Sequence, residues 1–148
     1  MTVTLHNAEE AIAYPMFVAK QSGNLKWAIE PSIFAAALIG LTIAAWIVTY
    51  LSWRNGPRSL AAHVIFGYAA AMLVNVFAPH VPLAIWFRGY TPGLFTAVAV
   101  NLPCLPFLLV CARSEDYVAS RKAAAASIAT VIGGAALAGV LSLTSIKQ

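Results

Sequence analysis

The stretch IFAAALIGLTIAAWIVTYLSW, residues 33–53, decides the fold of this chain. It contains no Lys, Arg, Asp or Glu, and its length suits a helix that crosses about 30 Å of hydrocarbon with about 20 residues. Backbone groups cannot stay unpaired in lipid, and the stretch lacks the alternation of a strand. We therefore expect Ile33–Trp53 to form a transmembrane helix.

The composition extends this prediction to the whole chain. Of its 148 residues 61% are hydrophobic and only 9% are charged, whereas soluble domains carry about 25% charged residues. Three more apolar stretches have cores without charge: Ala62–Ala78, Pro92–Ala112 and Ala123–Leu143. The sequence therefore predicts an all-α integral membrane bundle of four transmembrane helices, as a single domain over residues 1–148.

The second span has an unusual end. Residues 81–87 are apolar, so the helix can continue past kinks at Pro79 and Pro82 as far as Phe87. Membrane helices tolerate such prolines when neighbouring groups satisfy the freed carbonyls. His80 would then lie within the membrane or just below its surface.

The N-terminal segment is expected to form a shorter helix over residues 4–19. Thr2 or Thr4 can cap it, and Pro15 is expected to kink or end it. Because it is too short for a full span, we expect an amphipathic or partly inserted helix.

The net charge of +4 does not call for a nucleic-acid partner, because the basic residues lie at the ends of spans, next to the lipid bilayer. Their distribution favours both termini outside, in a plasma or inner membrane. The loops assigned to the inner side hold Arg54, Arg58, Arg113, Arg121 and Lys122, and the outer segments hold Lys20, Lys26, Arg88 and Lys147. With four spans, the N-terminal segment and the second connection lie on the same face.

The pentapeptide HNAEE, residues 6–10, begins the polar chemistry of the chain. On a helix His6 pairs with Glu9 at i,i+3 and with Glu10 at i,i+4, so the three side chains share a face. Imidazole and carboxylate bind zinc or iron, and a second carboxylate can act as general base. A solvated helix end is the alternative interpretation.

Further polar groups follow on the same predicted face. His80 is a functional candidate because ionisable residues in membranes are costly, although it can instead bond a carbonyl freed by the kink. Asn75 can orient a ligand, and Arg88 and Tyr90 can hold an anionic group or anchor a helix end. Asn101, in the middle of the third span, can bind substrate or bridge helices.

Two of these patches resemble the HXXEE family of small polytopic membrane proteins. HNAEE resembles its defining motif, and the segment from Asn75 and His80 through residues 88–93 to Thr96 resembles its second signature region. The similarity covers residues 5–112. In that family more apolar sequence precedes the histidine, whereas five residues precede it here. The family is classed mainly as of unknown function, with polar residues that suggest an enzyme; the resemblance implicates His6, Glu9, Glu10, His80 and Arg88.

These patterns predict a membrane-embedded, metal-dependent enzyme, hydrolase-like or di-iron oxygenase-like. The predicted ligands are His6, Glu9, Glu10 and His80, with a glutamate as base or bridging ligand and Arg88 stabilising charge. Zinc is slightly favoured over iron, because helical di-iron sites use more carboxylates. Apolar walls suggest a lipid-like or small hydrophobic substrate. Solute or proton-coupled transport, a purely structural protein and a homodimer remain open alternatives.

Overall fold

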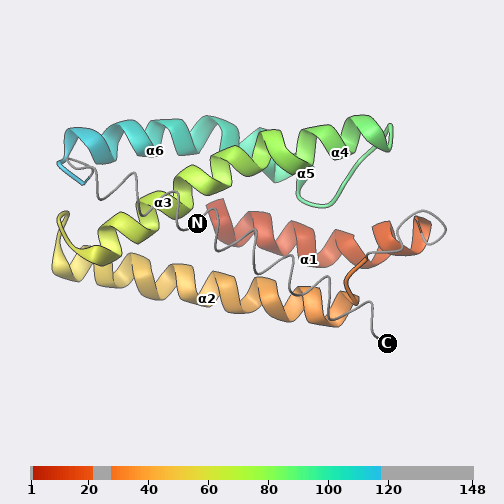
Figure 1. Cartoon of the computed structure of the whole chain (residues 1–148), viewed down its shortest axis with the longest axis horizontal. Helices are drawn as coiled ribbons and strands as arrows, with labels where there is room; N and C mark the ends of the chain where they lie inside the picture. The colour runs from red at the N-terminus through yellow and green to blue at the C-terminus, as the bar shows by residue number, and fades with distance from the viewer. Residues whose placement is uncertain (1, 22–27, 118–148) are drawn as a thin grey trace.

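A computed structural model of the chain describes residues 2–21 and 28–117 (Figure 1). Every regular element in these two ranges is a helix, and they contain no strand. Three helices are long and apolar enough to cross a membrane: Pro31–Asn55, Leu60–Trp86 and Leu94–Ser114. The all-helical prediction is thus confirmed, with features of a membrane protein. The predicted fourth span, Ala123–Leu143, lies outside the described residues, so a total of four is not established.

Helix α1, Thr2–Lys20, carries the HNAEE sequence and is not one of the three apolar helices. Pro15 lies inside it and does not end it. Toward the C-terminal end of α1, the Tyr14 hydroxyl donates to the carbonyl of Ile29, and the Phe17 ring packs edge-on against the Phe87 ring.

Helix α2, Pro31–Asn55, has clear sequence signals at both ends. The Glu30 carboxylate accepts a hydrogen bond from the Ile33 amide, and Pro31 occupies the first turn, where no amide proton is needed. Gly56 ends the helix at φ 83°, a backbone conformation that favours glycine. The short turn that follows makes the next helix an antiparallel neighbour of α2 (Figure 1).

The second and third apolar helices each contain a π-helical segment. The second comprises α3 (Leu60–Asn75), η1 (Val76–His80) and α4 (Val81–Trp86), and Ala78 has non-helical angles at the kink before Pro79. The third comprises α5 (Leu94–Thr96), η2 (Ala97–Asn101) and α6 (Leu102–Ser114). Single-turn π segments inside α-helices are frequent at functional sites.

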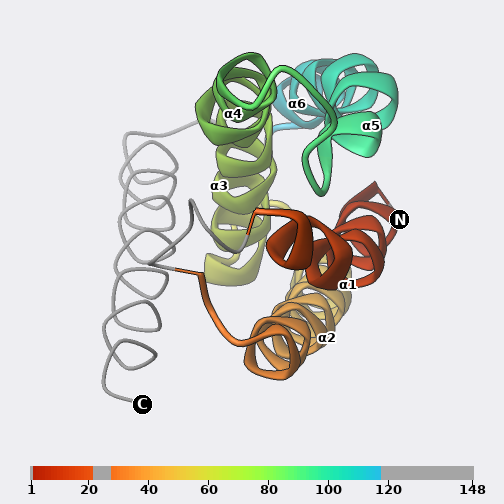
Figure 2. The same ribbon diagram turned by 90° about the vertical axis from the view of Figure 1, so that its right-hand side faces the viewer.

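The packing brings both π segments next to α1. Helix α1 contacts α2 on one side and α5 and η2 on the other, and η1 packs against η2. Figure 2 shows α1 between α2 and the α5–α6 helix. The polar residues of α1 therefore face the places where the second and third apolar helices depart from α-helical geometry.

The interior of this bundle is unusually polar. Large apolar side chains such as Ile47, Trp53, Trp86 and Phe107 are exposed, as expected for a surface that meets lipid. The buried polar residues are His6, Asn7, Ser52, His80, Thr91, Thr96 and Asn101. Two of them, His80 and Asn101, lie on the π segments, and His6 and Asn7 lie on α1, which packs against η2.

Asn7 sets the rotation of α1. Its amide nitrogen donates to Thr42 Oγ1 at 2.8 Å and to the Leu38 carbonyl of α2 at 3.4 Å. These contacts turn Asn7 toward α2, and residues His6 and Glu10 then face the second and third apolar helices.

Candidate metal centre

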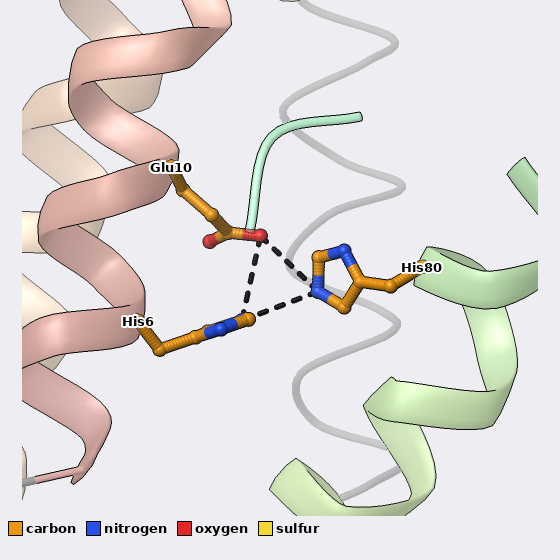
Figure 3. A group of neighbouring side chains, drawn as sticks. All are labelled: His6, Glu10 and His80. Atoms are coloured by element: carbon orange, nitrogen blue, oxygen red, sulfur yellow. Dashed lines mark hydrogen bonds and ion pairs between the residues drawn. The ribbon is translucent and has the colours of Figure 1, made fainter. Parts of the chain in front are cut away.

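His6, Glu10 and His80 form a cluster in which one ligand atom of each residue converges on the other two (Figure 3). His6 Nε2 lies 3.2 Å from His80 Nε2, and Glu10 Oε1 lies 3.5 Å from His80 Nε2 and 3.7 Å from His6 Nε2. The His6 and His80 side chains are buried, with 1% and 4% of their surface exposed. Among the described residues, this is the group that can hold a metal ion.

The hydrogen-bond pattern assigns the tautomer of His6. The Thr96 hydroxyl donates its proton to Glu9 Oε2 at 2.5 Å. At His6 Nδ1, 3.0 Å away, the same hydroxyl must therefore act as acceptor. His6 is then protonated on Nδ1, and its Nε2 directs a lone pair into the cluster.

His80 has the same property for a different reason. The Asn75 amide nitrogen lies 3.0 Å from His80 Nε2 and donates to it, so this nitrogen also carries a lone pair. Asn75 ends α3, five residues before His80, and the intervening π segment brings the two side chains together. Asn75 thus contacts His80 directly, and its role in orienting a ligand stays a prediction.

Two imidazole lone pairs and a carboxylate oxygen at these distances repel one another unless a cation or a proton lies between them. Zn²⁺ binds imidazole at about 2.0–2.1 Å, which in a tetrahedron places neighbouring ligand atoms about 3.3 Å apart. The observed separations of 3.2, 3.5 and 3.7 Å are close to that value. The cluster thus has the donor types and spacing for one small cation.

Glu9 lies outside the cluster and caps the third apolar helix. Its carboxylate accepts hydrogen bonds from the amides of Phe95 and Thr96, the Thr96 hydroxyl and the Tyr90 hydroxyl. The first amides of a helix have no partner within the helix, and a negative charge there is favourable. The two glutamates of the motif therefore occupy different surroundings: Glu10 joins the two histidines, and Glu9 joins α1 to α5.

These surroundings shift the pKa values in opposite directions. Burial, reinforced by the charge of Glu9, raises the pKa of Glu10 to about 8. Burial would also raise the pKa of Glu9, but the hydrogen bonds from Thr96, Tyr90 and Phe95 together lower it. Burial and the neighbouring His80 lower the pKa of His6 to about 4. His6 is thus neutral, the form that binds metals, and Glu9 is ionised.

Tyr90 forms the outer edge of this arrangement, and 52% of its surface is exposed. Burial of its hydroxyl and the hydrogen bond to Glu9 raise the pKa of Tyr90 above its usual range. The hydroxyl therefore stays protonated and donates to the Glu9 carboxylate.

Gly93 covers the cluster. A Cβ atom at this position would lie 2.7 Å from His80 Cε1, 2.8 Å from Glu10 Cγ and 2.9 Å from His6 Cε1. Gly93 also has φ 81°, which L side chains rarely adopt. The backbone of the connection before α5 thus reaches the three side chains at a distance that only glycine permits.

The remaining predicted site residues lie in different positions. Arg88 is exposed at φ 49°, and the structure assigns it no contact with the cluster. Asn101 is completely buried at the end of η2. His63 lies near the start of α3, within 2.6 Å of the Ser59 carbonyl, far along the helix from His80.

Sequence reasoning did not assign roles to Asn7, Gly93 or Thr96, all of which shape this site. Thr96 was the last residue of the second signature region, and Gly93 follows Pro92 immediately before a predicted helix. Both residues therefore lie in segments that the sequence pattern singles out. The residue type alone, however, does not indicate which side chains a threonine or a glycine contacts.

The fold and the site together define a class of protein: a small helical protein with apolar helices long enough to cross a membrane and a buried His/Glu cluster that can hold a metal. The chain belongs to the family described as "Protein of unknown function with HXXEE motif", which it matches over residues 1–108. It is 29% identical over 101 residues to "Uncharacterized protein YrkK" of Bacillus subtilis (strain 168). That match covers 68% of this chain and 63% of the relative, so the chain spans less than two thirds of the relative's length. No solved structure matches the chain.

Gly93→Ala tests the close approach of the backbone. The added methyl group must displace two rings and a carboxylate side chain, so we expect the variant to lose metal binding and about 1–3 kcal/mol of stability. Metal content and thermal unfolding in detergent provide the measurements. Gly89→Ala is the matched control, because its Cβ would meet only the Phe87 carbonyl, at 3.8 Å. Equal behaviour of the two variants would contradict the proposed geometry.

Thr96→Val tests whether the Thr96 hydroxyl orients His6. Removing a hydrogen-bond partner of a metal-binding histidine lowers metal affinity about 10–100-fold, and we expect a loss in this range by competition with a zinc chelator. Thr96→Ser keeps the hydroxyl and should stay close to wild type. If Ser and Val reduce the affinity equally, the hydroxyl does not orient His6.

Proposed function

We propose that this protein is a membrane-embedded, metal-dependent enzyme that binds one divalent ion, zinc in preference to iron, through His6, Glu10 and His80. The observation that carries the proposal is the convergence of one ligand atom each from His6, Glu10 and His80, at separations of 3.2, 3.5 and 3.7 Å. Two histidines and one glutamate are a ligand set of catalytic zinc sites, which keep a fourth position open for water or substrate.

The single carboxylate in the cluster favours one ion over two. Helical di-iron sites use four carboxylates and two histidines, whereas Glu9 is occupied by four hydrogen bonds to Tyr90, Phe95 and Thr96. We assign Glu9 a positioning role: it fixes Thr96, and Thr96 fixes the ring of His6.

A bound ion would supply an activated water at near-neutral pH. Asn75 is the residue placed to orient that water. Its amide donates to His80 Nε2 when this nitrogen is free, and it would release this bond when the nitrogen binds a metal. The freed amide could then donate to a water in the open position. Arg88, exposed at the same end of the bundle as Tyr90, is proposed to hold an anionic group of the substrate.

The apolar part of the proposed lipid-like substrate has a candidate cavity. A cavity of about 320 Å³ lies between α1, α2, α3 and α6, with walls that include Ile65, Phe66, Leu105 and Leu108. Tyr68 also lines it. We propose that a hydrocarbon chain in this cavity directs the polar end of the molecule past Tyr68 toward the cluster.

One observation favours the alternative of proton-coupled transport. Hydrogen bonds run without interruption from the exposed Tyr90 hydroxyl through Glu9 and Thr96 to His6. Such a chain can relay protons in a transporter. A protein that holds no metal but requires these residues for solute movement would favour this second function.

Elemental analysis of purified protein tests the proposal. We expect about one divalent ion per chain, lost in His6→Ala, His80→Ala and Glu10→Ala because each removes one of three ligands. Glu9→Gln should bind the ion more weakly than wild type but more tightly than the three ligand variants, because residue 9 positions His6 through Thr96 and is not itself a ligand. Circular dichroism provides the control for folding. Folded wild-type protein without metal would exclude the enzyme as proposed, and equal losses in Glu9→Gln and Glu10→Ala would contradict the separate roles.

A further inference from the structure

Asn101 is the buried polar side chain that the proposed centre leaves unexplained. It is 0% exposed. In the part of the chain that the structure describes, neither Asn101 Nδ2 nor Asn101 Oδ1 has a hydrogen-bond partner. Within the described residues, the Asn101 amide therefore does not bridge two helices, as such an amide typically does.

An amide without partners is costly inside a membrane protein, because neither lipid nor apolar side chains can replace the lost hydrogen bonds. Buried polar groups without partners in a native structure call for an explanation, and a ligand is one. Both atoms of Asn101 are unpaired, so a partner has to supply an acceptor and a donor together.

The position of Asn101 connects it with the metal centre. It ends η2, whose hydrogen bonds join residues five apart, and Thr96 is five residues earlier. Thr96 contacts His6 and Glu9, so Asn101 lies one π turn deeper on the same side of the helix. Segment η2 packs against α1, α3 and η1, which carry the cluster and Tyr68.

Two more observations point to a ligand in this part of the bundle. Besides the two atoms of Asn101, the described residues contain two more buried polar atoms without a hydrogen-bond partner, the Tyr68 hydroxyl and Thr91 Oγ1. Tyr68 and Leu105, which follows Asn101 by one helical turn, both line the 320 Å³ cavity. Tyr68 therefore lies in the cavity wall, and Asn101 lies one helical turn before Leu105, which is part of the same wall.

We propose that Asn101 binds an uncharged amide group of a lipid-like substrate whose hydrocarbon part occupies the cavity. A carboxamide offers a carbonyl to Asn101 Nδ2 and an N–H to Asn101 Oδ1, which matches the two unpaired atoms. A carboxylate would place a negative charge against Oδ1, and an ester has no donor for it. This inference rests on the proposed function, since it specifies the substrate of the same site.

The test uses full-length, zinc-loaded protein in detergent, labelled with ¹⁵N-asparagine. The chain contains five asparagines, at positions 7, 24, 55, 75 and 101, and the side-chain signal of Asn101 is assigned by its loss in Asn101→Leu. Hexanamide is titrated as the probe, and methyl hexanoate is the comparison without a donor. We expect a saturable shift of the Asn101 signal with hexanamide and about 10-fold weaker binding of the ester.

Asn101→Leu should bind hexanamide about 10–100-fold more weakly and keep its metal; Asn55→Leu, at an exposed position, is the control. Equal affinity for amide and ester, an unmoved Asn101 signal, or unchanged binding in Asn101→Leu would overturn the proposal. The proposal would also be overturned if the Asn101 side-chain signal showed contact with bound water and none with hexanamide. The comparison of amide and ester needs no substitution, so it holds even if the variant does not fold. Wild-type protein that binds hexanamide but takes up no zinc would leave this inference standing and refute the metal centre.

Discussion

The Glu9 carboxylate, bound to the first amides of the third apolar helix, is the contact on which the rest of the site depends. It joins α1 to α5, and through the Thr96 hydroxyl it fixes the proton of His6 on Nδ1. The lone pair of His6 Nε2 then faces His80 and Glu10. One ionised side chain therefore satisfies helix amides, positions a second helix and determines the form of a candidate ligand.

This arrangement gives the two glutamates of the HXXEE motif different physical roles. They are adjacent in sequence, but a rotation of about 100° per residue along α1 directs Glu9 toward α5 and Glu10 toward His80. A motif of three polar residues on one helix thus organises both the cap of a neighbouring helix and a buried cluster.

Much of the fold could be predicted from the sequence because the membrane restricts the choices. The charge-free stretch in residues 33–53 and the proline and glycine signals around it predict α2 almost to its ends. The continuation of the second helix past Pro79 also followed from its apolar composition. The π segments could not be predicted, because they arise where packing displaces one residue from the α-helical register, and local sequence does not encode that displacement.

The site was predictable in its residue types and less so in its contacts. His6, Glu10 and His80 were predicted as site residues because ionisable groups within a membrane are costly and therefore suggest a function. The structure brings these three side chains together. The position of Glu9 depended on the rotation of α1, which Asn7 sets through Thr42 and Leu38. The role of Gly93 depended on a tertiary contact, which spacing along the chain does not reveal.

X-ray absorption spectroscopy of the purified, zinc-bound protein tests the central claim most directly, because it counts the atoms around the ion. The account predicts four light ligands at about 2.0–2.1 Å, with the multiple scattering of two imidazoles. Six oxygen ligands, sulfur ligands, or a single imidazole would contradict a centre built from His6, Glu10 and His80.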